Sequence, residues 1–445
     1  MYITKEQTAR EEKRKMVKRT KTILAAAVTA AAAGCIAMPV SAEQAKVDIF
    51  QNKSGFAEQL QAAAELYMES HPDVTINVES VQGGDYSTSL NAKLLQEDGP
   101  EIFGAELTDM AGSFKDLLED LSDQPWVDAM SDEIKSNCSV DGKVLAIPVS
   151  VEGYGLVYNK EIFEAAGIDA STLTSYDAID EAFASLQEKI DNGELADQFP
   201  VLEAVEEYAA KETWLPGYHT VNVALQAELG DAPTALVTPE IELTYADGLK
   251  DLFDLLTKYT AYRDNLSMIN AVDYATQIGG GLAIERVAVV QQGNWIAPEM
   301  QNIAPDVAEK LDILPIPLKG TTEDSIAVGV SVTWGVNANS GDVDKAAAKD
   351  FLNWLFQSDE GKQIVVNEMG CIPAFNNYDG IEITEPLSAA VKRYMDEGKT
   401  MGWTMSGWPS GFEPASAAEF QAYLGGDMTW DECVEAVKND WASLR

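Results

Sequence analysis

The sequence predicts an α/β fold divided into at least two lobes. The chain has 445 residues, more than the roughly 100 to 200 residues of a typical domain, so each lobe needs its own core. Its composition, 46% hydrophobic and 8% aromatic, is that of an ordinary globular protein. Segments typical of strands and helices alternate along the chain. This alternation favours an open sheet with parallel strands.

The predicted fold starts with strands and helices in turn. KVDIFQNKSG is typical of a strand that ends in a turn, and FAEQLQAAAELYMESHP has apolar residues at helical spacing until its HP dipeptide. VTINVESV then alternates as a second strand, YSTSLNAKLLQEDG is another amphipathic helix, and PEIFGAEL is a short strand exit. We expect these segments to form the start of the first lobe.

The pattern changes at KVLAIPVSVEGYGLVYNKEIFEAAGID, where two apolar runs flank Pro148 and a loop that carries Glu152 and Tyr154. The chain is expected to cross to the second lobe here. The following residues hold long helical stretches and then the strand RVAVVQQGNW.

Two further crossings are predicted. The polar turn KGTTED is the candidate for the second. SIAVGVSVTWGVNA looks like a strand pair returning to the first lobe, and DVDKAAAKDFLNWLFQSDEGKQIV is a strong amphipathic helix. A third crossing follows at GCIPAF, and the last segments are helices joined by aromatic loops. The predicted lobes are residues 43–150 and 316–370 for the first, and 151–315 and 371–445 for the second.

Residues 1–42 predict a secretory signal. A basic run, EEKRKMVKRTK, precedes an apolar segment that is too short and alanine-rich for a good membrane span. Two cleavage sites fit. AAGC resembles a lipoprotein box, which would end the signal at residue 34 and lipidate Cys35, whereas VSA fits ordinary signal peptidase after Ala42. Met1 and Met16 are both candidate starts. We expect an exported protein, either a cell-surface lipoprotein or a free extracellular or periplasmic protein.

The chain is strongly acidic, with a formal net charge of −42. Removal of residues 1–42 deletes eight of the 31 basic residues and three of the 73 acidic residues, which leaves a net charge near −47. Nucleic acid and anionic lipid surfaces are therefore poor partners for the mature chain. The only membrane attachment expected is the lipid anchor, and the charge itself is explained by solubility.

Cysteine and histidine are sparse. The cysteines beyond Cys35 are far apart and lack CxxC spacing, although a single bridge between Cys371 and Cys433 is compatible with the sequence. His71 and His219 stand alone, which argues against a histidine-based metal site or catalytic triad. IGGGLA matches neither glycine-rich phosphate motif. We expect no metal and no cofactor. Besides Cys35, Cys371 and Cys433, the chain has one further cysteine, Cys138.

Six segments, taken in order, carry a family resemblance. The chain resembles the extracellular solute-binding proteins of bacterial carbohydrate ABC importers, the class that includes maltose-binding protein, over nearly all of its mature length. The segments are GPEIF, AIPVSVEGYGLVYNKEIFEAAGI, VAVVQQGNW, ILPIPLKG, FLNWLFQSDEGKQ and TWDECVEAVKND.

The resemblance implies a periplasmic-binding-protein-like fold, with two α/β lobes, three hinge crossings and a ligand cleft between the lobes. It implies a monomer that captures a sugar and delivers it to ABC permease subunits without catalysis. We expect the sugar to be an oligosaccharide. Two alternatives stay open. One is a binding protein for a peptide, polyamine or other charged solute. The other is a secreted glycan-active enzyme, although no carboxylate pair is marked out for glycoside hydrolysis.

A neutral sugar needs flat aromatic rings for its C–H faces and planar polar groups for its hydroxyls. Trp295 is the clearest candidate, because GNWIAP is loop-like after a strand and its glycine permits close approach. The resemblance places Trp295 at the family's stacking position, and the alternative is an indole in the core of the second lobe. Asn294 or Gln292 would bond a hydroxyl or cap the helix that begins near Pro298.

Other aromatic candidates stand in the later part of the chain. Trp403 and Trp408 lie in the glycine-rich GWTMSGWPSGF, and one of them, with Trp408 favoured, is expected to line the cleft. Trp214 and Tyr218 flank a Pro-Gly turn as an extra aromatic wall. Trp334 ends a strand and fits the core and the site equally well. The tryptophans expected to be structural are Trp126, Trp430 and Trp441.

The remaining candidates come from the first lobe and the first crossing. Lys53 and Phe56 stand at the first strand-to-helix turn. By resemblance, Glu106 and Asp109 match positions whose carboxylates bind sugar hydroxyls, and the alternative is a solvated helix start. Glu152 and Tyr154 match hinge-proximal contact positions, and the alternative for Tyr154 is a structural role.

Overall fold

The computed structural model describes residues 44–81, 85–96 and 98–445. The predicted signal, with its lipidation site Cys35, lies outside the described residues. Residues 43–445 form one compact unit. Within the described part of this unit, no helix is both long and apolar enough to cross a membrane.

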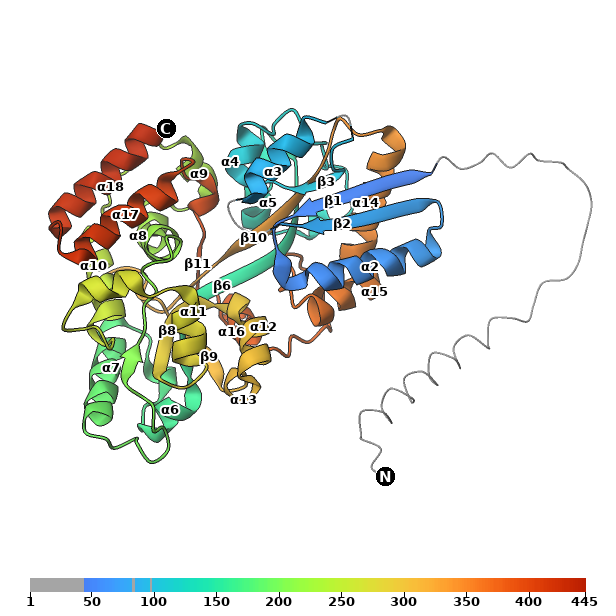
Figure 1. The fold of residues 1–445 in the computed structure, drawn as a ribbon. Coiled ribbons are helices and arrows are strands. Elements are labelled where there is room, and N and C mark those ends of the chain that lie inside the picture. Colours follow the sequence, from blue (N-terminus) through green and yellow to red (C-terminus); the bar gives the residue numbers. More distant parts are fainter. Residues whose placement is uncertain (1–43, 82–84, 97) are drawn as a thin grey trace, which may run out of the picture. The chain divides into compact units, whose positions relative to one another are not determined.

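One nine-stranded sheet runs through the unit in the order β2-β1-β3-β10-β6-β8-β7, with β11 beside β10 and β9 beside β6 (Figure 1). β1 pairs in parallel with β2 and β3, as the alternating start of the chain predicts. The strands are β1 (Ala45–Gln51), β2 (Val74–Ser80), β3 (Ile102–Gly104), β6 (Ile147–Asn159), β7 (Ala204–Glu206), β8 (Val287–Gly293), β9 (Leu311–Leu314), β10 (Ile326–Val336) and β11 (Thr400–Gly402).

The first lobe surrounds β1, β2 and β3. α14 packs on β1, and α2 packs on β2. A separate two-stranded hairpin, β4 (Ser139–Val140) with β5 (Lys143–Val144), precedes β6. The helices of this lobe are α2 (Ala57–Ser70), α3 (Asp85–Leu94), α4 (Leu107–Ala111), α5 (Asp132–Asn137), α14 (Asp342–Gln357) and α15 (Asp359–Gln363), with the short turns η1 (Ser54–Phe56), η2 (Val127–Ala129) and η8 (Ile364–Glu368).

The second lobe is mainly helical around β7, β8 and β9. α17 packs on α18, and α7 packs on β7. Its helices are α6 (Lys160–Ala165), α7 (Tyr176–Asp191), α8 (Val221–Leu229), α9 (Ala232–Val237), α10 (Ala246–Lys258), α11 (Tyr274–Gln277), α12 (Ala297–Ile303), α13 (Pro305–Ala308), α16 (Pro386–Glu397), α17 (Phe412–Gly425) and α18 (Trp430–Leu444). Its short turns are η3 (Ala170–Thr172), η4 (Leu215–Thr220), η5 (Leu266–Ala271), η6 (Ile278–Leu282), η7 (Asn294–Ile296) and η9 (Met405–Gly407).

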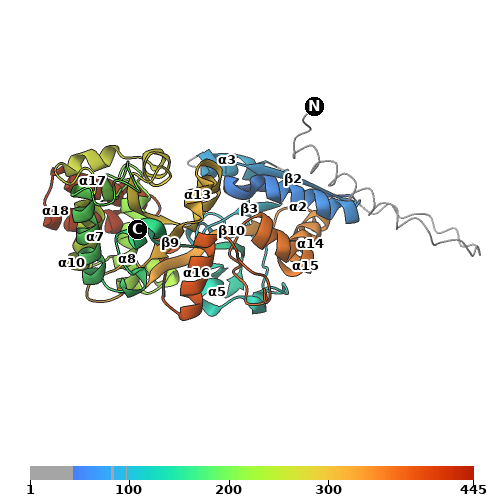
Figure 2. The same ribbon diagram turned by 90° about the horizontal axis from the view of Figure 1, so that it is seen from below.

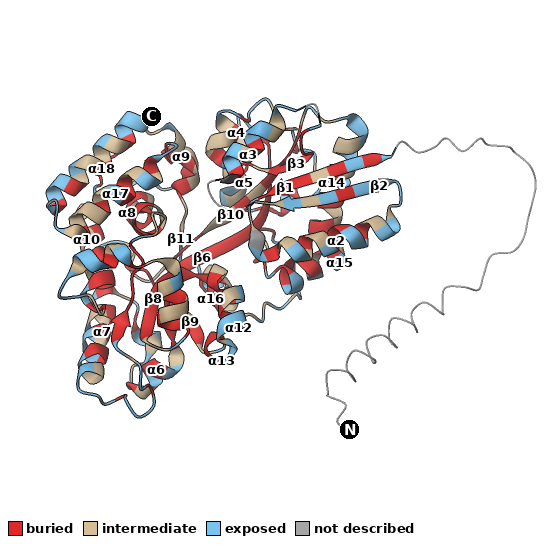
Figure 3. Ribbon diagram, in the orientation of Figure 1, coloured by how far each residue is buried: buried red, intermediate tan, exposed pale blue. Residues whose placement is uncertain are grey.

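Two long strands, β6 and β10, pass through both lobes. The first half of β6 pairs with β10, and its second half pairs with β8 and β9. Every residue of β6 is buried (Figure 3). The loop predicted at Glu152 and Tyr154 is therefore wrong. A Cβ on Gly153 would collide with Val391, and one on Gly155 with the Leu314 carbonyl. These glycines allow close packing of a continuous strand and do not mark a turn.

The predicted second crossing also differs from the structure. The KGTTED turn is tied to α7 of the second lobe, since Lys319 pairs with Asp177 at 2.7 Å and Glu323 accepts the N–H of Tyr176 at 2.9 Å. The chain instead crosses within β10, which is one strand and not a pair. Register shifts between Val330 and Thr333 form a bulge there, which bends the strand between the lobes.

At the third crossing, the N–H of Val151 donates to the carbonyl of Ile372 at 2.9 Å, within the predicted GCIPAF segment. The chain then enters α16, which packs against β6, β9 and β10 (Figure 2). Three segments thus link the lobes, as the family resemblance implies.

Each lobe has its own buried core. Trp126, Trp334 and Tyr67 are among the large side chains of the first, and Phe183, Phe253 and Trp441 of the second. Cys371 lies in the first core and Cys433 in the second, and both thiols are free and buried, as is that of Cys138. The bridge between Cys371 and Cys433 is therefore wrong.

Candidate functional site

A cavity of about 730 Å³ is lined by residues of both lobes. The first lobe contributes the β3-to-α4 segment, including Glu106 and Asp109. The bulged part of β10 contributes Ser331 and Thr333, and the second lobe contributes Tyr218 and the segment from Trp403 to Pro414. The cavity therefore joins five of the predicted site residues: Glu106, Asp109, Tyr218, Trp403 and Trp408.

Three carboxylates line this cavity. Asp109 accepts the N–H of Glu106 at 3.3 Å at the start of α4, and Glu413, at the start of α17, accepts the hydroxyl of Thr213 at 2.7 Å. Among the described residues, none of the three forms an ion pair, and no lysine, arginine or histidine lines the cavity. The site thus combines acceptor groups that have no cationic partner.

The cavity changes the protonation of Glu106. Its side chain is exposed to solvent, yet the surrounding protein, followed by the charges of Asp109 and Glu413, raises its pKa to about 7. Burial also raises the pKa of Asp109. A raised pKa favours the protonated form of Glu106, which can donate as well as accept a hydrogen bond with a hydroxyl.

The second lobe supplies an aromatic wall. Trp408 stands edge-on to Tyr218, with ring centroids 5.3 Å apart, and donates its indole N–H to Thr404 at 3.0 Å. Only 3% of Trp408 is exposed, whereas Trp403 is half-buried. Trp403 lies over Gly329 of β10, where a Cβ would collide with its ring. Trp403 therefore exposes more ring surface than Trp408, although the sequence analysis favoured Trp408 as the residue that lines the cleft.

Trp295 lies outside the lining of this cavity, in an aromatic cluster at the end of β8. It is half-buried, and its ring centroid is 6.2 Å from that of Tyr154, 6.3 Å from that of Trp214 and 5.0 Å from that of His219. Its indole N–H donates to Oε1 of Gln292 at 2.7 Å. Since this N–H is already used, Trp295 has only its ring surface to offer a ligand.

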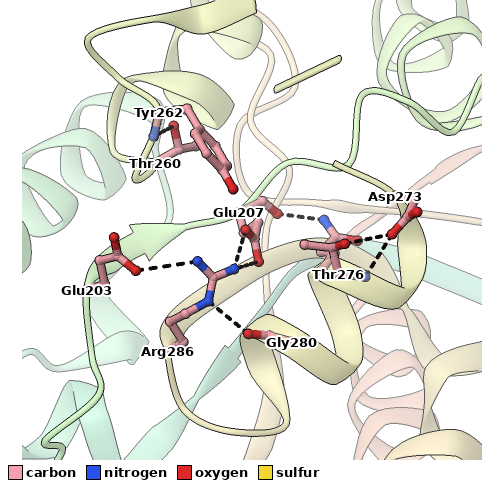
Figure 4. Close-up of polar contacts among 9 residues, drawn as sticks. Glu203, Glu207, Thr260, Tyr262, Asp273, Thr276, Gly280 and Arg286 are labelled. Atoms are coloured by element: carbon pink, nitrogen blue, oxygen red, sulfur yellow. Dashed lines mark hydrogen bonds and ion pairs between the residues drawn. The ribbon is translucent and has the colours of Figure 1, made fainter. Parts of the chain in front are cut away.

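A chain of hydrogen bonds behind Trp295 holds Gln292 in place. Gln292 donates to Oε1 of Gln277 at 2.7 Å, and Gln277 donates to the carbonyl of Glu207 at 2.6 Å. The carboxylate of Glu207 pairs with Arg286 at 2.5 and 2.7 Å (Figure 4). Both glutamines are fully buried. The orientation of the indole is therefore set by groups inside the second lobe.

The predicted polar companion Asn294 is structural. It is buried, accepts the N–H of Gly153 at 3.0 Å and donates to Ser388 at 3.2 Å. Both ends of its amide are therefore used in joining β6 to α16, and it neither caps α12 nor faces the cavity. Glu152 is also buried and forms an ion pair with Lys53, and neither lines the cavity.

Three predicted site residues lie in the cores. Trp334 is fully buried, with its ring 6.3 Å from Phe56 in an edge-on contact, and Phe56 itself is 3% exposed. Tyr154 is fully buried and donates its hydroxyl to the carbonyl of His219 at 2.7 Å. The expectation of ligand contacts at these three positions is therefore corrected, because packing leaves no ring surface free.

Glu413, Ser331 and Thr333 also line the cavity but were not predicted from the sequence. Glu413 closely follows the predicted aromatic loop, so its position next to a glycine-rich turn was the available signal. Ser331 and Thr333 are the polar residues of the alternating run SVTW, but their direction depends on the bulge in β10. No feature of the sequence distinguishes His219, which lies inside the aromatic cluster.

Comparisons with known proteins identify the family of the chain. The sequence model of a family described as bacterial extracellular solute-binding protein matches residues 62–394. The xylose/arabinose-binding protein XacG of Haloferax volcanii is 23% identical over 350 residues, 75% of this chain and 70% of XacG. The melibiose/raffinose/stachyose-binding protein MelE of Bacillus subtilis is 23% identical over 346 residues, 74% of this chain and 75% of MelE.

The fold has solved counterparts. The apo form of RafE from Streptococcus pneumoniae superposes with a TM-score of 0.70 at 16% identity, over 90% of this chain and 98% of RafE. This likeness confirms the two-lobe α/β architecture that the sequence predicts.

Proposed function

The chain belongs to the bacterial extracellular solute-binding proteins, and we propose that its solute is a sugar, specifically an oligosaccharide, which it delivers to an ABC permease without catalysis. The observation that carries the proposal is the composition of the cavity. It combines the rings of Trp403 and Tyr218 with the carboxylates of Glu106, Asp109 and Glu413, which have no cationic partner among the described residues. Rings match the C–H faces of a sugar, and carboxylates match its hydroxyls. The sugar-binding relatives XacG and MelE support this choice.

The size of the cavity supports an oligosaccharide. Its volume of about 730 Å³ lies in the upper part of the range of roughly 300 to 1,000 Å³ for small-molecule sites. The ring of His219 contacts Trp403, which lines the cavity, and also Trp295 and Trp214, which lie beyond it. A ligand longer than one ring would therefore find aromatic surface beyond the cavity itself.

The proposed transport step follows from the position of the carboxylates. Glu106 and Asp109 belong to the first lobe, whereas Glu413 and Trp403 belong to the second. A sugar that contacts both groups binds most tightly when the lobes are together, so binding shifts the population towards that state. The permease can then distinguish the loaded protein from the empty one by shape.

The test is a panel of neutral sugars, including raffinose, stachyose, melibiose, xylose and arabinose. At least one should raise the melting temperature, because ligand at about 100 times its Kd stabilises the native state by ~2.7 kcal/mol. Trp403→Ala or Trp295→Ala should weaken binding by ~1–3 kcal/mol through loss of one aromatic face. Trp354→Ala, a half-buried tryptophan packed on the first core, is the control and should bind normally. The absence of any shift across the panel would contradict the sugar assignment.

A cationic solute, such as a polyamine, is the second candidate. The three carboxylates of the cavity favour it, together with the absence of basic residues among the described lining. Spermidine and putrescine therefore belong in the same panel. A thermal shift with either amine and with no sugar would select this alternative.

We also propose export through the signal at residues 1–42, with lipidation of Cys35 as the anchor; the monomeric state is part of the same proposal. Cys35→Ala should move the protein from the membrane fraction to the medium, because no other attachment is expected. Cys138→Ala, at a buried free cysteine, is the control and should leave the distribution unchanged. Retention of Cys35→Ala in the membrane would argue for cleavage after Ala42 with another mode of attachment.

A further inference from the structure

His219 lies at the centre of the aromatic cluster of the second lobe. It belongs to the π-helical turn η4 that precedes α8, a type of turn that is frequent at functional sites. Five aromatic rings surround its imidazole: Tyr154 at 4.4 Å, Trp295 at 5.0 Å, Trp214 at 5.2 Å, Trp403 at 6.0 Å and Tyr218 at 6.1 Å between centroids. The three tryptophans are half-buried, so the cluster reaches the surface through them.

His219 is only 8% exposed, and within the described residues its Nδ1 is buried without a hydrogen-bond partner. Among the neighbouring polar groups, the Tyr154 hydroxyl and the Trp295 indole N–H have partners, whereas the Trp403 indole N–H is, like Nδ1 of His219, buried without one in the described structure. A buried polar group without a partner carries a free-energy cost, so its presence calls for an explanation.

The protonation state of this ring suits a hydroxyl. Burial lowers the pKa of His219 to about 3, so the imidazole is neutral in the usual range of pH. A neutral imidazole has one donor and one acceptor nitrogen, and a sugar hydroxyl likewise donates and accepts. Two of the five surrounding rings, the half-buried Trp295 and Trp403, offer the flat surface on which the same sugar ring would pack.

We propose that His219 is a ligand-binding residue, which hydrogen-bonds a hydroxyl of a sugar ring packed on Trp295 and Trp403. The inference rests on the proposed sugar-binding function and extends the site from the cavity to this aromatic cluster. The competing explanation is a histidine that serves only to fill the core of the second lobe. The two explanations differ in what a phenylalanine at this position would do.

His219→Phe tests the proposal, because phenylalanine keeps the stack on Tyr154 and removes both ring nitrogens. The ligand-free variant should melt at the wild-type temperature or above it, since an unpartnered buried polar group is lost. Its affinity for the sugar that shifts the wild-type protein in the panel above should fall on the order of tenfold, the loss of about one hydrogen bond. His219→Gln, which restores a donor and an acceptor, should recover part of the affinity. Calorimetric titration measures both variants.

His71→Phe is the matched control. This second histidine stacks on Tyr67 at the end of α2, in the first lobe, and its replacement should leave sugar affinity unchanged. Wild-type sugar affinity in His219→Phe would overturn the proposal, and a lower melting temperature with unchanged affinity would identify a core role. If the wild-type protein binds none of the sugars, the proposed function fails and this inference with it. Sugar binding by the wild type that His219→Phe leaves intact refutes the inference alone.

Discussion

Glu206→Gln is expected to stabilise the protein at pH 8 and to flatten the pH dependence of its unfolding. Glu206 lies on β7, is fully buried, and neither of its carboxyl oxygens has a partner within the described residues. Burial, with a further contribution from the charge of Glu207, holds its pKa well above the ordinary value. The folded protein therefore keeps a proton on Glu206 at pH values where the unfolded chain has released it.

The sign of the effect follows from this difference in bound protons. Above the pKa of about 4.5 in the unfolded chain, the folded state binds more protons, so the free energy of unfolding falls as the pH rises. The slope is about 1.4 kcal/mol per pH unit, up to the pKa of the folded state. Glutamine has nearly the same shape and does not titrate, so the contribution of Glu206 to the slope should vanish in the variant.

Urea unfolding of the wild type and Glu206→Gln at several pH values between about 5 and 8 measures the difference directly, because the other titrating groups are common to both proteins. Glu203→Gln is the control, since the side chain of Glu203 is 57% exposed and should not alter the slope. Parallel curves for Glu206→Gln and the wild type would show that Glu206 is ionised in the folded protein.

Trp334→Ala is expected to lower the free energy of unfolding by about 3–5 kcal/mol, the usual cost of truncating a large buried aromatic side chain. Trp334 is fully buried and makes edge-on contacts with Phe56 and Phe356 at 6.3 and 6.2 Å. Its removal leaves a cavity that the first core cannot fill without moving β10. Denaturant unfolding measures the loss.

Trp403→Ala is the matched comparison, because this half-buried indole lines the cavity. It should lose far less stability than Trp334→Ala and instead weaken ligand binding. A destabilisation of Trp334→Ala below about 1 kcal/mol would place this residue outside the well-packed core.

Much of the fold could be predicted from local patterns. The alternating start of the chain, the long helices α7 and α10, and the strand that ends at Gly293 all agree with their sequence signals. The errors fall where a local signal has a tertiary cause. A loop was expected at Glu152 and Tyr154, but Gly153 and Gly155 let α16 and β9 approach a continuous strand. Likewise, the segment expected to form a pair of strands is one strand, β10, with a bulge in it.

The candidate site was predictable only in part. Glu106, Asp109, Tyr218, Trp403 and Trp408 do line one cavity, which agrees with the residue types that a sugar requires. The expected ligand contacts failed at Trp334, Phe56 and Asn294. These residues resemble the lining residues in type and local sequence, but segments far away along the chain pack over them and bury them.

The two-lobe α/β architecture, the solute-binding family and the acidic character of the chain could all be inferred from composition, periodicity and the order of the segments that resemble the family. Which rings and carboxylates line the cavity could be established only from the folded chain. Trp334 and Trp403 each stand near a glycine in sequence, yet one is enclosed by the first core and the other lines the cavity. Exposure depends on contacts between distant segments, and no local pattern encodes those contacts.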